Sequence, residues 1–101
     1  MSGTTATDKS GEVVGLDDAG AQARQALANI AHAIERAGGA LTDIVRTRIF
    51  VVNIARDWEA IGRAHGEMFR DIRPATSMIE VRALIDPRML VEIEADAILS
   101  P

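Results

Sequence analysis

The sequence lacks cysteine altogether, and aromatic residues make up only 3% of its 101 residues. The absence of cysteine excludes disulfide frameworks, thiolate nucleophiles and zinc sites that use cysteine ligands. With so few aromatic rings, the core must be built from alanine, isoleucine, valine and leucine. No apolar run approaches the roughly 20 residues that a membrane span needs, and residues 1–7 contain neither the charged nor the apolar region of a secretory signal. A cytoplasmic protein without a membrane partner is therefore expected.

Basic residues are also in short supply, with 11 lysines and arginines against 15 aspartates and glutamates. The net charge of −4 argues against nucleic acid as a partner, because a nucleic-acid-binding domain carries an excess of basic residues on one face. The two histidines, His32 and His65, are too far apart for a metal site of the HExxH type, and no metal is expected. The length and the 48% apolar composition fit one globular domain over residues 1–101.

The first half of the chain predicts a helix with recognisable ends. Asp17 or Asp18 can cap its start, since a carboxylate accepts hydrogen bonds from the free N–H groups of the first turn. The helical period runs to Ala37, and Gly38-Gly39 then supply the left-handed backbone that ends a helix. Six apolar residues are expected to form its buried stripe: Ala23, Leu27, Ile30, Ala31, Ile34 and Ala37.

Residues 44–52 alternate with a period of two and are rich in β-branched residues, which predicts a strand. One face carries Val45, Thr47, Ile49 and Val51, and the other carries Ile44, Arg46, Arg48, Phe50 and Val52. Asp57 is expected to cap a second helix that extends to about Phe69, because Pro74 disfavours a continued helix at Arg73. One side of that helix is expected to carry Trp58, Ile61, His65 and Met68.

The last quarter of the chain predicts a hairpin with its turn at Asp86-Pro87. In its first strand, one face carries Ser77, Ile79, Val81 and Ala83, and the other carries Thr76, Met78, Glu80 and Arg82. In its second strand, Val91, Ile93, Ala95 and Ala97 alternate with Glu92, Glu94 and Asp96. The whole order predicts an α+β fold in which two helices cover one face of a small mixed β-sheet.

The second face of the predicted sheet is strongly charged. It combines Phe50 and Met78 with Arg46, Arg48, Glu80, Arg82, Glu92, Glu94 and Asp96. One interpretation is a solvated face with cross-strand ion pairs, each of which stabilises the fold only slightly. The other is a subunit interface in which acids and arginines pair between chains. The residues alone leave these two interpretations open.

Common catalytic motifs are missing from the sequence. Its glycines match neither phosphate-binding loop pattern, and no serine lies in a G-x-S-x-G elbow. A lone histidine on an apolar helix side, as expected for His65, is more often structural than catalytic, although its titration near neutral pH leaves proton transfer open. Glu92, Glu94 and Asp96 are spaced two residues apart on one strand face, and such groups are suited to general acid–base work. A salt-bridged or solvent-facing role is favoured for Glu94 and Asp96.

Several short segments, taken in order, resemble one family of small proteins. The first is Ser2-Gly3 at the end of an early strand, and residues 21–30 (AQARQALANI) follow in a first helix. Ala37-Gly38 mark the helix end, and residues 43–47 (DIVRT) lie in the next strand. Pro74-Ala75 begin the penultimate strand, and residues 91–95 (VEIEA) lie in the last strand. The ordered set is similar to the Rid family, also called YjgF or L-PSP-like proteins. The similarity runs from residue 2 to about residue 98.

The resemblance implies a chorismate-mutase-like fold and a homotrimer in which the sheet faces pack together, with small-molecule clefts between subunits. It also implies hydrolysis of reactive enamines and imines of 2-keto acids with release of ammonia, as in 2-iminobutanoate/2-iminopropanoate deaminases. Active members of the family work without a metal or an organic cofactor. Some members have been described as ribonucleases, but the acidic balance of this chain gives that activity no support.

The same resemblance points to the residues of the cleft. Glu92 is expected to orient or activate the attacking water. Six other residues are expected to contact the ligand: Ser2, Gly3, Thr76, Met78, His65 and Arg73. His65 stands where many members have a tyrosine or phenylalanine, so the chemistry of the cleft can differ from theirs.

Thr76 stands where the deaminating members carry an arginine that grips the substrate carboxylate. A hydroxyl cannot give bidentate, charge-assisted recognition. Three outcomes stay open: a substrate without a carboxylate, help from another cation such as Arg73, or loss of imino-acid deamination. The alternative function is a non-catalytic small-molecule-binding or regulatory protein on the same scaffold.

The chain also begins later than is usual in the family, whose members have a strand and most of a second one before the position of Ser2-Gly3. The expectation is a domain without the family's N-terminal strand pair, which reflects either a misassigned start codon or a short chain. A missing pair would expose sheet edge and apolar surface.

Overall fold

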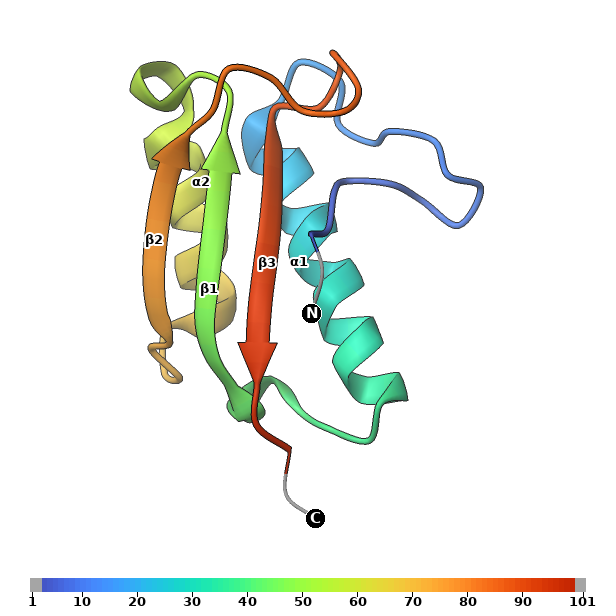
Figure 1. Cartoon of the computed structure of the whole chain (residues 1–101), viewed down its shortest axis with the longest axis vertical. Coiled ribbons are helices and arrows are strands. Elements are labelled where there is room, and N and C mark those ends of the chain that lie inside the picture. Colours follow the sequence, from blue (N-terminus) through green and yellow to red (C-terminus); the bar gives the residue numbers. More distant parts are fainter. Residues whose placement is uncertain (1–2, 100–101) are drawn as a thin grey trace.

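The computed structural model describes residues 3–99, and Figure 1 shows their arrangement. The elements follow the predicted order of helix, strand, helix, strand and strand, with a short 3-10 helix before the first strand. They are α1 (Ala19–Arg36), η1 (Leu41–Asp43), β1 (Ile44–Val51), α2 (Ile54–Phe69), β2 (Ala75–Glu80) and β3 (Val91–Ala97). Neither α-helix of this described part has the length and apolar content to cross a membrane.

The three strands form one mixed sheet in the order β2-β1-β3. β1 pairs in parallel with β2 and antiparallel with β3, so β1 is the central strand (Figure 1). The predicted hairpin is therefore wrong, because the last two strands lie on opposite sides of β1. α2 returns the chain to the end of the sheet where β1 began, which makes β2 parallel to β1, and residues 81–90 then lead across to the far side of β1.

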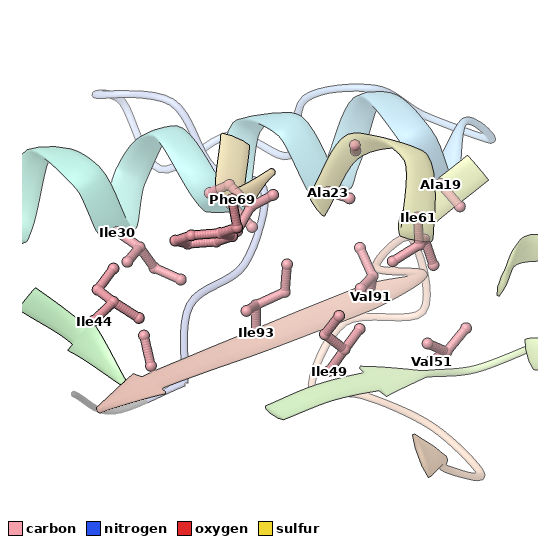
Figure 2. Close-up of a cluster of buried hydrophobic side chains, with 14 of the residues drawn as sticks. Ala19, Ala23, Ile30, Ile44, Ile49, Val51, Ile61, Phe69, Val91 and Ile93 are labelled. Carbon is pink, nitrogen blue, oxygen red and sulfur yellow. The ribbon is translucent and has the colours of Figure 1, made fainter. Parts of the chain in front are cut away.

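Both helices cover one face of the sheet and bury the core between the two layers (Figures 1 and 2). α1 contributes Leu27 and Ile30, α2 contributes Ile61, and the sheet contributes Ile49 and Ile93, each at most 1% exposed. Burying an aliphatic side chain fully stabilises a fold by roughly 1.5–3 kcal/mol. The predicted α+β arrangement is confirmed, and the core is mainly aliphatic as expected.

The ends of α1 follow from local chemistry. Asp18 caps the first turn, its Oδ1 accepting a hydrogen bond of 3.0 Å from the backbone N–H of Ala21. Gly38 follows the helix with φ of +87°, a left-handed conformation that glycine adopts at low cost. The buried stripe ends sooner than predicted, since Ala31 is only half-buried and Ala37 is exposed.

α2 begins earlier than predicted. Its N-cap is Asn53 rather than the predicted Asp57. The side chain of Asn53 accepts a hydrogen bond of 3.2 Å from the backbone N–H of Arg56. Asp57 lies inside the first turn, is 7% exposed and pairs with the guanidinium of Arg56 at 2.8 Å. Trp58 is 56% exposed, so it does not join Ile61 on the buried side. Asparagine and aspartate cap helices equally well, so a polar residue near the helix start does not fix the start by itself.

β1 departs from simple alternation at its start. A register irregularity between Ile44 and Arg46 puts Ile44 in the core and leaves Val45 44% exposed, the reverse of the predicted faces. The remaining inward-facing residues keep the predicted alternation and are buried: Thr47, Ile49 and Val51.

The faces of β2 are the reverse of those expected. Met78 and Glu80 were expected on the charged face, but their partners on β1 are Ile49 and Val51, which face the helices. β2 also ends at Glu80, so residues 81–83 belong to the following loop. The sheet face away from the helices, called the open face below, carries Arg46, Arg48, Phe50, Ser77, Ile79, Glu92, Glu94 and Asp96.

Candidate functional site

A chain of hydrogen bonds links β1, α2 and β2 on the helix side of the sheet. Oγ1 of Thr47 lies 2.8 Å from Nε2 of His65 and 2.9 Å from Oγ1 of Thr76. Thr47 is fully buried, His65 is half-buried and Thr76 is exposed, so the chain runs from the core to the surface. Thr47 was missed as a site residue. The signal that could have found it is a hydroxyl within an otherwise aliphatic inward face of β1.

The surroundings of His65 keep its imidazole neutral. The ring centroid of Phe69, one turn further along α2, lies 4.7 Å from that of His65. Burial lowers the pKa of His65 below its ordinary value of 6.5, because a charged imidazolium loses solvation there. At neutral pH the ring therefore has one N–H donor and one acceptor nitrogen.

Two other predicted ligand contacts lie close to Thr76 in the chain. Arg73 is exposed in the turn before β2, where its backbone has φ of +52° and its Nε donates to the carbonyl of Arg70 at 3.4 Å. Met78 is half-buried and packs against the core. β2 therefore presents Thr76 to the surface and directs Met78 towards the interior.

Glu92 lies on the open face of β3, close to the N-terminal segment. Thr4 exchanges two backbone hydrogen bonds with Ile93, 2.8 Å and 2.9 Å long, which hold the chain alongside β3. Gly3 thereby comes so close to Glu92 that a Cβ atom on residue 3 would overlap Oε2 of the carboxylate. Glycine is the residue that leaves this space to the Glu92 side chain. Ser2, the neighbouring predicted contact, lies outside the described residues.

Three other charged residues of the open face, Arg48, Glu94 and Asp96, are paired within the chain. Arg48 forms a bidentate pair with Asp96, with distances of 2.9 and 3.0 Å, and donates a further hydrogen bond of 2.8 Å to Glu94. Because these bonds favour the charged forms, the pKa of Arg48 is raised and the pKa of Asp96 is lowered. Within residues 3–99, Glu92 and Arg46 form no ion pair. The carboxylate of Glu92 thus differs from its two acidic neighbours on β3.

The predicted site residues fall into two groups that one chain does not bring together. Thr76 and Met78 lie on the helix side of β2, whereas Gly3 and Glu92 lie at the open face of β3, with β1 between them. Successive side chains of a strand point to opposite faces of the sheet, and a ligand on one face does not reach the other. A cleft that contains both groups therefore needs a second copy of the chain.

Two further features bear on what the site could hold. A surface hollow of about 390 Å³ is lined by Gly3, Thr4, Thr5, Thr7, Asp8, Lys9, Asn29 and His32. Among the predicted site residues that the structure describes, Gly3 is the one that lines this hollow. In the described part of the chain, no three histidine, aspartate or glutamate side chains come together in the way a metal ion would require.

Relatives match this chain along nearly all of its length. A model of the family described as Endoribonuclease L-PSP matches residues 1–99. The 3-aminoacrylate deaminase RutC of Acinetobacter baylyi is 37% identical over 97 residues, which cover 96% of this chain and 75% of the relative. The crystal structure of Rv2704 from Mycobacterium tuberculosis, a member of the YjgF/YER057c/UK114 family, has a TM-score of 0.84 at 49% identity, covering 96% of this chain and 75% of that one. The Rid protein YyfB from Yersinia pestis has a TM-score of 0.91 at 40% identity, covering 98% and 76%.

Proposed function

The chain belongs to the Endoribonuclease L-PSP family, the family of the YjgF and Rid proteins, and from that premise we propose that it hydrolyses reactive imines and enamines with release of ammonia. The observation that carries this proposal is the carboxylate of Glu92, which lies against Gly3 and has no cationic partner within residues 3–99. A deaminase relative at 37% identity supports the same class of reaction.

Glu92 acts as the general base in the proposed reaction. Its carboxylate accepts a proton from water, and the water oxygen attacks the imine carbon while the C=N electron pair moves to nitrogen. The proton passes from Glu92 to that nitrogen, and the resulting carbinolamine collapses to a carbonyl compound and ammonia. One imine and one water thus give one carbonyl compound and one ammonia. An enamine first gains a proton on carbon and becomes the imine.

We place the reaction between subunits of a homotrimer with the chorismate-mutase-like arrangement. One copy contributes Glu92, Gly3 and Ser2, and its neighbour contributes Thr76, Met78, His65 and Arg73. This division follows the separation of the two groups on opposite faces of the sheet. Consistent with the acidic composition, the proposal assigns no nucleic-acid partner, and it places the protein in the cytoplasm without a metal or organic cofactor.

One residue favours a second candidate, a small-molecule-binding or regulatory protein without catalysis. The deaminating members that this chain resembles carry an arginine at the position of Thr76. Losing a charged hydrogen-bond partner costs about 1.5–3 kcal/mol, roughly ten- to a hundredfold in affinity or rate. In this second candidate the cleft binds its ligand and Glu92 has no catalytic role.

Ammonia release from freshly generated imines, with and without a carboxylate, separates the two candidates. We expect release by the wild-type protein and a loss of about 100-fold or more in Glu92→Gln, because an amide cannot accept a proton from water. Glu94→Gln is the matched control on the same strand face, and it should keep most of the activity. If no imine yields ammonia with the wild-type protein, the binding protein becomes the better description.

A further inference from the structure

The hydroxyl of Thr76 is committed to the protein as a donor, and this limits what a ligand can offer it. A threonine hydroxyl has one proton and two acceptor lone pairs. Oγ1 of Thr76 lies 3.1 Å from the carbonyl oxygen of Pro74 and 2.9 Å from Oγ1 of Thr47. The single proton of Thr76 therefore has two protein acceptors within reach.

Both directions of the hydrogen-bond chain give the same result at Thr76. If Thr76 donates to Pro74, then Thr47 donates to Thr76 and Nε2–H of His65 donates to Thr47. If Thr76 donates to Thr47, then Thr47 donates to Nε2 of His65. In this tautomer the imidazole carries its proton on Nδ1. In each case a protein acceptor takes the proton of Thr76, and a lone pair of its oxygen is left for a ligand.

Of the three side chains in this hydrogen-bond network, Thr76 is the one that a ligand can reach most easily. It is exposed on β2, whereas Thr47 behind it is 0% exposed. Turning the proton of Thr76 outward would break the hydrogen bond to Pro74 in the first direction, a net loss of about 0.5–1.5 kcal/mol. In the second direction it would take a donor away from the buried hydroxyl of Thr47. A carboxylate placed against Thr76 would therefore meet a lone pair where it needs a proton.

We propose that Thr76 selects substrates whose polar end presents a hydrogen-bond donor, such as a carboxamide, an amine or a hydroxyl, in place of a carboxylate. The preferred class is an imine like 2-iminopropanamide, and 2-iminopropanoate is disfavoured. The reaction assigned to this class rests on the proposed function, but the hydrogen-bond polarity of Thr76 is measurable without turnover.

Binding of the two hydrolysis products tests the polarity directly. Pyruvamide and pyruvate have nearly the same shape, but one ends in N–H donors and the other in an anion. In NMR titrations of the ¹⁵N-labelled full chain, pyruvamide should bind about tenfold more tightly or better. Thr76→Ser should keep this preference, and Thr76→Val, which has the shape of threonine without its hydroxyl, should lose it. Thr76→Arg should reverse it in favour of pyruvate.

Several results would overturn the proposal. These are equal or tighter binding of pyruvate by the wild-type protein, no binding of either compound, and an unchanged preference in a Thr76→Val protein whose thermal unfolding is normal. If pyruvate is preferred, Arg73→Gln shows whether the nearby guanidinium holds the carboxylate, since pyruvate binding would then fall in that variant.

Ammonia release from the two imines keeps this specificity separate from the reaction itself. Faster ammonia release from 2-iminopropanamide than from 2-iminopropanoate supports both the proposed specificity and the proposed reaction. Release from 2-iminopropanoate alone supports deamination and overturns the specificity. Preferred binding of pyruvamide without ammonia from either imine supports the specificity and overturns the proposed reaction.

Discussion

Glu92 and Glu94 are two residues apart on the same face of β3, yet their neighbours differ. Glu94 accepts a hydrogen bond from Arg48 at 2.8 Å, whereas Glu92 lies against Gly3. A carboxylate whose lone pairs are engaged by a guanidinium has fewer left for a water molecule. The contacts of single residues, rather than residue type, therefore favour Glu92 as the base.

Gly3→Ala tests whether the close approach to Glu92 matters. The new Cβ would overlap Oε2 of Glu92, and the carboxylate must turn away, which it can do as the flexible end of a side chain. We expect ammonia release to fall about tenfold or more through misplacement of the base, while the thermal unfolding midpoint changes by less than about 2 °C. Gly66→Ala, where a Cβ meets nothing within 4 Å, is the control and should keep full activity. Full activity in Gly3→Ala would contradict this role for Gly3.

The buried imidazole of His65 predicts a pH dependence of stability. Because the pKa of His65 is lowered in the folded protein, the unfolded chain binds a proton more readily. The stability that the neutral imidazole of His65 contributes to the folded protein is fully present above the unfolded pKa of 6.5. It is lost as pH falls towards the lower pKa of the folded state. Denaturant unfolding between about pH 7 and pH 5.5 should show a falling free energy of unfolding in wild type and a flatter profile in His65→Gln. Equal slopes in wild type and His65→Gln would disprove the assignment.

Some helices and strands could be predicted from signals in their own sequence, whereas the pairing of others depends on residues far away in the chain. α1 was predictable because Asp18 and Gly38 mark its ends and its apolar stripe is continuous. The hairpin was wrong because each strand pairs with β1, a contact that neither strand's own sequence encodes. The faces of β2 failed for a related reason: Met78 and Ile79 are both apolar, so either face could have been buried until the register with β1 fixed it. The same non-local pairing brings Thr47 to Thr76, which is why that part of the site was not foreseen.

Asn53→Ala tests where α2 begins. The side chain of Asn53 satisfies the backbone N–H of Arg56 at 3.2 Å, and removing such a cap costs about 1 kcal/mol. Denaturant unfolding should show this loss, and Asn53→Asp should restore most of the stability because a carboxylate caps equally well. Unchanged stability in Asn53→Ala would mean that another group starts the helix.

The whole molecule has one covered sheet face and one open face. The helices bury the first, while the second exposes Ile79 by 44% beside the paired charges of Arg48, Glu94 and Asp96. The cross-strand pairs show that these charges are satisfied within one chain, so an apolar contact between copies need not leave them unpaired. This combination suits a face that packs against other copies, as the proposed trimer requires.

Light scattering should therefore give a mass near three times 10.8 kDa. Ile79→Glu should break the assembly into monomers, because it would bury a charge without a partner in the interface. Ile85→Glu is the matched control: this isoleucine is 92% exposed in the loop before β3, and its replacement should leave the trimer intact. Circular dichroism should show that both variants stay folded.

Activity of the dissociated protein then tests the link between assembly and site. Since Thr76 and Glu92 lie on opposite faces of the sheet, a folded Ile79→Glu monomer should lose ammonia release together with the trimer, and the Ile85→Glu protein should keep both. A wild-type monomer at micromolar concentration would refute the trimer. A fully active monomer would refute the shared cleft, because all of the chemistry would then have to come from one face of one chain.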